Sequence, residues 1–136
     1  MPGSAERTAS KTPARTAEAR ARKPVLKFRM RITDGDVIAV GPGKIALLEA
    51  IEKTGSITAA AKSLDMSYRR AWVLLDEVNR SLRAPAVDSA KGGSTGGGSA
   101  LTDTGRELIE LYRRIEETAA TACRTDIRKL IGLLAR

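Results

Sequence analysis

The sequence predicts a mainly α-helical fold with a small β content, and three observations predict it. Residues 54 to 75 read TGSITAAAKSLDMSYRRAWVLL, which is typical of two short helices joined by a tight turn. Before this stretch, apolar residues alternate with cations in the pattern of a strand with one buried face. After it, apolar residues recur at helical spacing over about 30 residues near the C-terminus.

A β-hairpin is expected between residues 26 and 40. From residue 26 to residue 32, Leu, Phe, Met and Ile alternate with Lys and Arg, which predicts a strand. Asp34-Gly35 is a strong tight-turn dipeptide, and residues 37 to 40 supply the return strand. Gly41-Pro42-Gly43 then ends the hairpin. A helix is expected at about residues 43 to 53, with Ile45, Leu48 and Ile51 on one stripe.

Capping residues predict where the next two helices begin and end. Gly55 can take the positive φ that closes the preceding helix, and Ser56 can cap the following one. Leu64, Asp65 and Met66 form the turn, where Asp65 tolerates the left-handed region. Ser67 caps the second helix, which runs to about residue 82. Its inward face is expected to hold Ala71, Leu74, Leu75, Val78 and Leu82.

The second helix opens with cations, which favours DNA binding over an ordinary αα-hairpin in a helical bundle. A helix-turn-helix places such a helix in the major groove of DNA. Ser67, Tyr68, Arg69 and Arg70 are therefore the expected contacts. We expect Trp72 to pack at the edge of the core, the alternative being a contact with bases.

A strand, a glycine-rich loop and a second strand follow this helix, at residues 85 to 88, 91 to 98 and 99 to 101. This order is that of the wing of a winged helix-turn-helix, with Lys91, Gly92 and Gly93 placed to contact the DNA backbone. The alternative, a nucleotide-binding loop, requires Gly-Lys-Ser/Thr opening a helix, and Ser99-Ala100-Leu101 stands there instead. A hairpin end without a ligand is the other alternative.

The last segment is predicted to be a long helix, residues 102 to 136, that starts at Thr102 and Asp103. One small domain cannot easily cover so long an apolar stripe, so we expect burial against a second copy of the chain. Thr125-Asp126 can restart the helix after a kink, which leaves one helix or two consecutive helices open. The expected dimerisation residues are Leu108, Leu111, Tyr112, Ile115 and Ala119.

The amino-acid composition excludes several classes of function. The chain has no His and one Cys, which excludes His-dependent acid–base chemistry and Cys/His zinc sites, so we expect neither an enzyme nor a cofactor. Cys123 is expected to be a small packed residue. Residues 1 to 31 hold nine Lys/Arg against two Asp/Glu, most of the formal charge of +8. We interpret residues 1 to 24 as a disordered basic tail suited to phosphate contact, a transit peptide being the minority interpretation.

Several motifs together resemble a known family. GPGKIALLEAIEKTGSITAAAKSLDMSYRRAWVLLDEVN, followed by GGSTGGGSALTDTGRELIELY, closely resembles the DNA-binding domain of ModE-type molybdenum-dependent transcriptional regulators, and more distantly the LysR-type winged helix. The resemblance implies a winged helix-turn-helix at residues 25 to 101 and a dimer that binds a palindromic operator. Family members continue into molybdate-binding domains that have no counterpart here. We therefore expect no molybdate binding within this chain.

The sequence thus predicts a cytoplasmic, homodimeric regulator of transcription that binds double-stranded DNA and has no membrane partner. The alternative from another class is a protein-interaction module, in which a winged domain docks a separate sensor or transcription component through its C-terminal helix.

Overall fold

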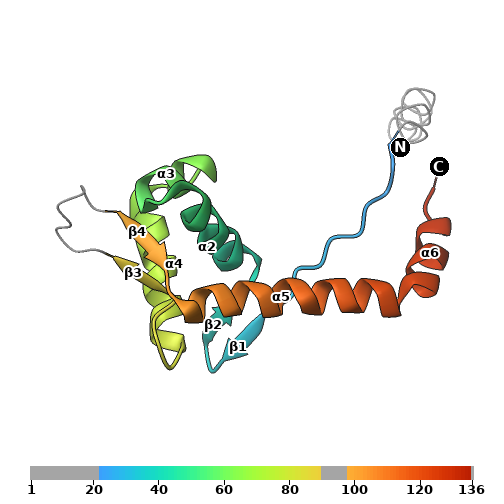
Figure 1. Ribbon diagram of the computed structural model, residues 1–136. Coiled ribbons are helices and arrows are strands. Elements are labelled where there is room, and N and C mark those ends of the chain that lie inside the picture. The colour runs from blue at the N-terminus through green and yellow to red at the C-terminus, as the bar shows by residue number, and fades with distance from the viewer. Residues whose placement is uncertain (1–21, 90–97, 136) are drawn as a thin grey trace, which may run out of the picture. The chain divides into compact units, whose positions relative to one another are not determined.

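The computed structural model describes residues 22 to 89 and 98 to 135. These residues divide into two units, one of Phe28–Thr118 and one that comprises residues 22 to 27 and 119 to 135. In the part of the chain that the structure describes, the fold is mainly helical, with two separate two-stranded antiparallel sheets, as Figure 1 shows. This confirms the predicted fold class of α-helices with a small β content. Among the described residues, no helix combines the length and the apolar character that crossing a membrane requires.

The first sheet is a hairpin of β1 (Ile32–Asp34) and β2 (Val37–Val40), with a turn that includes Gly35 at φ +65°. Both the turn and the return strand were predicted. The prediction of a strand from residue 26 is wrong, because β1 begins at Ile32, which pairs with Val40. Its partner ends there, since the next residues, Gly41 and Pro42, turn into a helix and proline has no N–H to donate. Residues 26 to 31 therefore lack a ladder to join.

Helix α2 (Pro42–Thr54) supplies four of the six largest fully buried side chains among the described residues. Proline opens it, where its missing N–H is no loss. Gly55 closes it at φ +80° and donates its N–H to the carbonyl of Ile51 at 2.8 Å, as predicted. The buried side chains of α2 are Lys44, Ile45, Leu47, Leu48 and Ile51.

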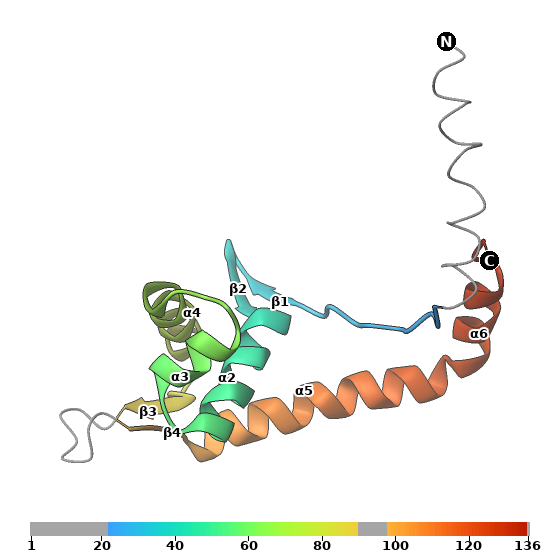
Figure 2. The ribbon, with the colours of Figure 1, turned by 90° about the horizontal axis from the view of Figure 1, so that it is seen from above.

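Helices α3 (Ile57–Ser63) and α4 (Tyr68–Ser81) follow α2, and Figure 2 shows the three grouped together. The predicted caps are present: Ser56 Oγ accepts from the Ala59 N–H at 2.9 Å, and Ser67 Oγ accepts from the Arg70 N–H at 3.0 Å. Asp65 lies in the left-handed region at φ +56°. The turn therefore has the backbone that the sequence predicted, with an aspartate at a position that favours glycine.

The main core lies between these helices, β3, β4 and the start of α5. Ala60, Ala61 and Ala71 are buried at the contact between α3 and α4, where small side chains let two helices approach closely. A second apolar cluster joins β2, α2 and α5. It consists of Ala39, Val40, Ile45 and Tyr112, with Met30 and Leu108 packed against it.

The second sheet pairs β3 (Val87–Ser89) with β4 (Ser99–Leu101), with Val87 opposite Leu101. Asn79 of α4 holds the start of this hairpin, since its Oδ1 accepts from the Ala86 N–H at 2.8 Å. The Ser99 N–H donates to the carbonyl of Gly55 at 3.0 Å, which ties β4 to the end of α2. The two strands were predicted. The predicted wing tip, with Lys91, Gly92 and Gly93, lies outside the described residues.

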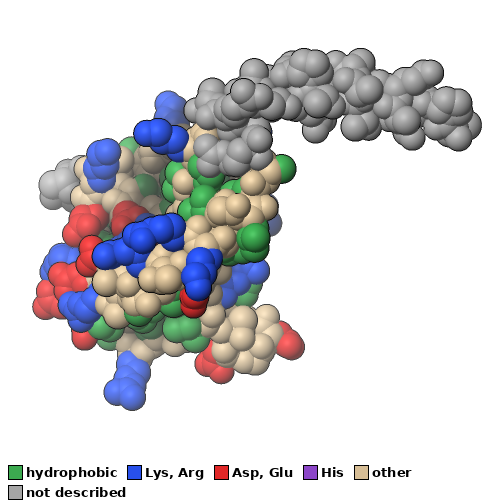
Figure 3. All heavy atoms as spheres, turned by 90° about the vertical axis from the view of Figure 1, so that its right-hand side faces the viewer, with side chains coloured by type: hydrophobic (Ala, Val, Ile, Leu, Met, Phe, Trp, Pro, Cys, Tyr) green, Lys and Arg blue, Asp and Glu red, His purple; other side chains and the backbone are tan. Residues whose placement is uncertain are grey.

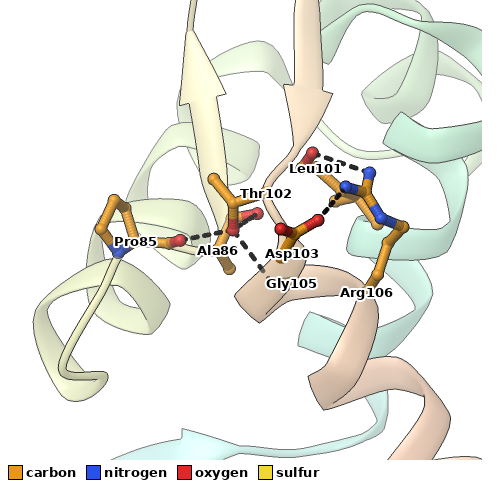
Figure 4. A network of polar contacts seen from close by, with 7 residues as sticks. All are labelled: Pro85, Ala86, Leu101, Thr102, Asp103, Gly105 and Arg106. Atoms are coloured by element: carbon orange, nitrogen blue, oxygen red, sulfur yellow. Dashed lines mark hydrogen bonds and ion pairs between the residues drawn. The ribbon is translucent and has the colours of Figure 1, made fainter.

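Thr102 and Gly105 lock the start of α5 (Asp103–Ala122) onto the residues that precede β3, as Figure 4 shows. The Thr102 hydroxyl donates to the carbonyl of Pro85 at 2.6 Å and accepts from the Gly105 N–H at 3.0 Å. A Cβ on Gly105 would overlap the carbonyl oxygen of Ala86. Only glycine allows this approach, which explains the spacing of Leu-Thr-x-x-Gly in the sequence.

The C-terminal segment forms two helices, α5 and α6 (Arg124–Gly132), which settles the alternative that the sequence left open. Cys123 stands between them, two residues before the predicted restart at Thr125. The prediction that Cys123 is packed is wrong: its side chain is exposed. Residues 121 to 126, on both sides of the helix break, are all exposed, so the spacing that predicted its burial has no packing partner among the described residues.

Candidate nucleic-acid interface

Helix α4 presents a continuous exposed face on the side away from the core. This face consists of Arg69, Val73, Asp76 and Arg80, which are spaced four, three and four residues apart and so lie along one side of the helix. Arg80 Nη2 pairs with Asp76 Oδ2 at 2.6 Å, so those two charges largely offset each other. Arg69 remains as the cation of this face in the first turn, and Val73 is its apolar member.

Tyr68 and Trp72 form an aromatic pair beside that face. Their ring centroids are 6.2 Å apart and their planes meet at 79°, an edge-to-face contact. The prediction that Trp72 packs at the edge of the core is wrong, since 39% of it is exposed and the core does not include it. Its neighbour Ala71 occupies the buried direction of α4, and the next residue points about 100° away from it.

Arg70 lies on the opposite flank of α4 from this aromatic pair. It borders a cavity of about 400 Å³ between α4 and the β1–β2 hairpin. Arg69 and Arg70, which the sequence predicted as one set of contacts, therefore face different directions. The cavity is lined by Arg29, Arg31, Asp36, Val37, Ile38, Gly41, Pro42, Gly43, Lys44, Arg70, Leu74 and Glu77.

Lys44 holds the walls of this cavity together. Its side chain is buried, its ammonium donates to the carbonyl of Ile38, and it forms an ion pair with Glu77 at 3.0 Å. A buried cation needs such partners, because desolvation without them is costly. Lys44 of α2 thereby connects the hairpin to α4 and fixes their spacing.

Ser67 is the remaining predicted DNA contact among the described residues. Ser67 is exposed, and its hydroxyl oxygen is engaged in capping α4. Figure 3 shows another face, the right-hand side of Figure 1, on which cationic, acidic and hydrophobic side chains are interspersed. This agrees with the near balance of charge in residues 32 to 136, fifteen Lys/Arg against fourteen Asp/Glu. A basic surface must therefore come from local clustering.

The predicted dimerisation residues differ in how much of each is exposed. Leu111 and Ile115 are exposed, at 43% and 49%, while Leu108 and Ala119 are half-buried. The prediction that Tyr112 contacts a second copy of the chain is wrong, because the residue is only 3% exposed within its own unit. Its hydroxyl donates to the carbonyl of Met30 at 2.8 Å. Burial raises the pKa of the Tyr112 phenol, and the Glu116 carboxylate adds to this effect, so the phenol keeps its proton for that hydrogen bond.

Next to Tyr112, Arg113 fastens α5 to α2. Its guanidinium donates to both carboxylate oxygens of Glu49, at 2.9 and 2.6 Å, and to Glu116 at 2.7 Å. These hydrogen bonds raise the pKa of Arg113 above its ordinary value. These contacts hold α5 against α2 within the unit that also carries α4.

Sequence reasoning missed the cations that border the cavity, namely Arg29, Arg31 and Lys44. The signal for the first two was present, since cations occupy every second position from residue 27 to residue 31. Lys44 carried no such signal, because a lysine in the first turn of a helix is ordinarily a solvent-exposed residue.

Comparison with known proteins supports the resemblance seen in the motifs. The chain is 46% identical over 81 residues to the molybdenum-pterin-binding protein MopB of Rhodobacter capsulatus, a match covering 60% of this chain and 30% of that protein. It is 45% identical over 92 residues to the molybdenum transport protein ModE of Azotobacter vinelandii, covering 66% of this chain and 34% of that protein.

A third relative is the DNA-binding transcriptional dual regulator ModE of Escherichia coli K12, 42% identical over 71 residues, which are 52% of this chain and 27% of that protein. The chain thus spans about a third of the length of these relatives. No family model matches the chain.

Proposed function

We propose that this chain is a DNA-binding regulator of transcription with a winged helix-turn-helix at residues 25 to 101. The observation that carries the proposal is the arrangement of α3, its tight turn and α4, with a capped helix start and an exposed Arg69 in the first turn. Such a helix fits the major groove and presents its N-terminal residues to base edges. The β3–β4 hairpin follows where a wing belongs.

Similarity supports the same function. The E. coli relative is named as a transcriptional regulator that binds DNA. In the present chain, base reading falls to the exposed face of α4, with Arg69 as its hydrogen-bond donor and Val73 as a side chain able to contact a thymine methyl. Lys91, Gly92 and Gly93 are the proposed backbone contacts of the wing.

The proposal includes a homodimer that binds a palindromic site through two copies of α4. Exposed apolar residues on α5 and α6 favour it, because leaving them in water exposes a large apolar surface. In such a dimer the two recognition helices lie about 34–36 Å apart, one turn of DNA, or a multiple of that spacing. Leu111 and Ile115 are the proposed centre of the contact, with Leu108 and Ala119 beside them.

The direct test is selection of bound duplexes from a random-sequence DNA library by the full chain, followed by affinity measurements on Arg69→Ala. We expect the wild-type chain to enrich a palindrome. Arg69→Ala should lose about 1–3 kcal/mol of binding free energy on the selected site, with a relaxed preference at the base pair that Arg69 contacts. Arg128→Ala, which removes an exposed cation of α6, is the control and should change neither the affinity nor the base preference. Wild-type affinity and preference in Arg69→Ala would show that α4 does not read DNA.

A specific observation also favours the alternative of a protein-interaction module. Leu130, Leu133 and Leu134 are exposed at 63%, 81% and 49%, an apolar surface that a separate sensor or transcription component could cover. The same library selection separates the two functions, because a protein-interaction module enriches no DNA sequence.

We further propose that the chain does not bind molybdate by itself. The relatives whose names mention molybdenum extend over about three times the length that this chain matches. Calorimetry with sodium molybdate should show no saturable heat at micromolar concentration. Stoichiometric binding would overturn this proposal and leave DNA binding untouched.

A further inference from the structure

The cavity between α4 and the β1–β2 hairpin gathers cations from three separate parts of the chain. Arg29 and Arg31 come from the segment that leads into β1, Lys44 from α2, and Arg70 from α4. Arg29, Arg31 and Arg70 are exposed, whereas Lys44 is buried. Two carboxylates, those of Asp36 and Glu77, line the same cavity. The balance between these charges decides what the cavity can bind.

That balance is positive. Lys44 and Glu77 neutralise each other through their ion pair at 3.0 Å. Within residues 22 to 89 and 98 to 135, no ion pair engages Arg29, Arg31 or Arg70, and they face the single remaining carboxylate of Asp36. Guanidinium groups gathered in this way suit the oxygens of a phosphate, because each presents a planar fork of N–H donors.

The position of the cavity relative to α4 indicates which phosphate the guanidinium groups would bind. Arg70 and Asn79 are nine residues apart on α4, which at about 100° per residue places them on opposite sides of the helix. Asn79 holds the start of β3 on one flank, and Arg70 borders the cavity on the other. The exposed face with Arg69 and Val73 lies between these flanks. A duplex that receives this face in its major groove has a phosphate backbone along each flank.

We propose that Arg29, Arg31 and Arg70 form a phosphate clamp on the DNA backbone, on the flank of α4 opposite the β3–β4 hairpin. This inference rests on the proposed DNA-binding function and adds a second backbone contact to it. Lys44 is a positioning residue, since it neutralises Glu77 and holds the hairpin against α4. The clamp fixes the register of α4 in the groove and carries no base preference of its own.

The test uses Arg29→Gln combined with Arg31→Gln in the full chain, with Arg128→Gln combined with Lys129→Gln as a control of equal charge change. Binding to the library-selected duplex and to a random duplex is measured over a range of salt. We expect the log–log salt slope of the Arg29/Arg31 variant to become shallower by about 0.9 for each phosphate that is no longer neutralised, so by about 1.8 for two. The ratio of the two affinities should stay at its wild-type value, and the control should keep the wild-type slope.

A second measurement keeps the test decisive if the double variant unfolds. Wild-type protein and the single variant Arg31→Gln are bound to selected duplexes that carry one neutral methylphosphonate at a time. We expect a flanking position at which the neutral group weakens wild-type binding and leaves the binding of Arg31→Gln unchanged. Sensitivity that is equal in both proteins at every position would overturn the clamp.

The outcomes separate this inference from the function on which it depends. Failure of the wild-type chain to prefer any duplex would remove the proposed function. A wild-type preference with an unchanged salt slope in the Arg29/Arg31 variant would remove the clamp alone. Titration with inorganic phosphate should show no saturable binding at millimolar concentration, and stoichiometric binding would assign the cavity to a free anion instead of DNA.

Discussion

The two halves of α5 have similar apolar spacing but different surroundings. In the first half, Gly105, Ile109 and Tyr112 are buried against β2, α2 and the residues before β3. Farther along the helix, Ile115 is 49% exposed, whereas Ile109 is 9% exposed. Their spacing of six residues places the two side chains about 120° apart around the helix. Apolar residues at helical spacing therefore predict that something covers them, but the chain itself covers the side of α5 with Ile109 and Tyr112 and leaves Leu111 and Ile115 open.

The largest expected effect is in the first half of α5. Ile109→Ala should lower the free energy of unfolding by about 2–5 kcal/mol, because it leaves a cavity in the main core. The matched substitution Ile115→Ala should change it by no more than about 0.5 kcal/mol at concentrations where the chain is a monomer. Chemical denaturation of both variants measures the difference. Equal losses would mean that Ile115 is covered within its own chain.

Gly105→Ala tests the close approach of α5 to Ala86. The added Cβ overlaps the carbonyl oxygen of Ala86, a backbone atom that cannot rotate away. We expect a loss of about 1–3 kcal/mol or more, despite the better helix propensity of alanine. Gly132→Ala in α6, where a Cβ meets nothing within 4 Å, is the control. A Gly105 variant as stable as this control would show that the two segments can move apart freely.

Tyr112→Phe isolates one hydrogen bond of the second apolar cluster. Removing the hydroxyl leaves the Met30 carbonyl without this partner, so the free energy of unfolding should fall by about 0.5–1.5 kcal/mol. The phenol has a raised pKa, so it loses its proton less readily folded than unfolded. The stabilisation that the protonated phenol provides is complete below pH 10, the ordinary pKa of tyrosine. It is lost as the pH rises through the raised pKa of Tyr112 in the folded chain. The Phe variant should lack that part of the alkaline loss of stability, and an unchanged alkaline limb would contradict the assignment.

Ile115→Asp should have the smallest effect on the fold and a clear effect on association. In a dimer, two aspartates would face each other without partners, which is strongly unfavourable. We expect a monomer by sedimentation, a melting temperature that no longer depends on protein concentration, and a weak residual affinity for a half-site. Thr121→Asp, an exposed position of α5, provides a charge-matched comparison. Wild-type chain that sediments as a monomer at tens of micromolar would contradict the dimer.

Features that depend on neighbours three or four residues away could be predicted from the order of the residues. Gly55, Ser56, Ser67 and Thr102 mark helix ends because their hydrogen bonds or backbone angles are satisfied locally. Asp65 takes the left-handed turn, and Asp34-Gly35 reverses the first hairpin, for the same reason. Local chemistry of this kind needs no knowledge of the rest of the fold.

The covering of apolar and charged side chains, by contrast, depends on the folded chain as a whole. Tyr112 is buried by Met30, 82 residues away, whereas Trp72 remains exposed in a helix of equal amphipathic character. The arginines at positions 29 and 31 meet Arg70 at one cavity because Lys44 draws the hairpin and α4 together. Burial depends on segments that the chain brings together only when it folds, and the spacing within one helix does not specify them.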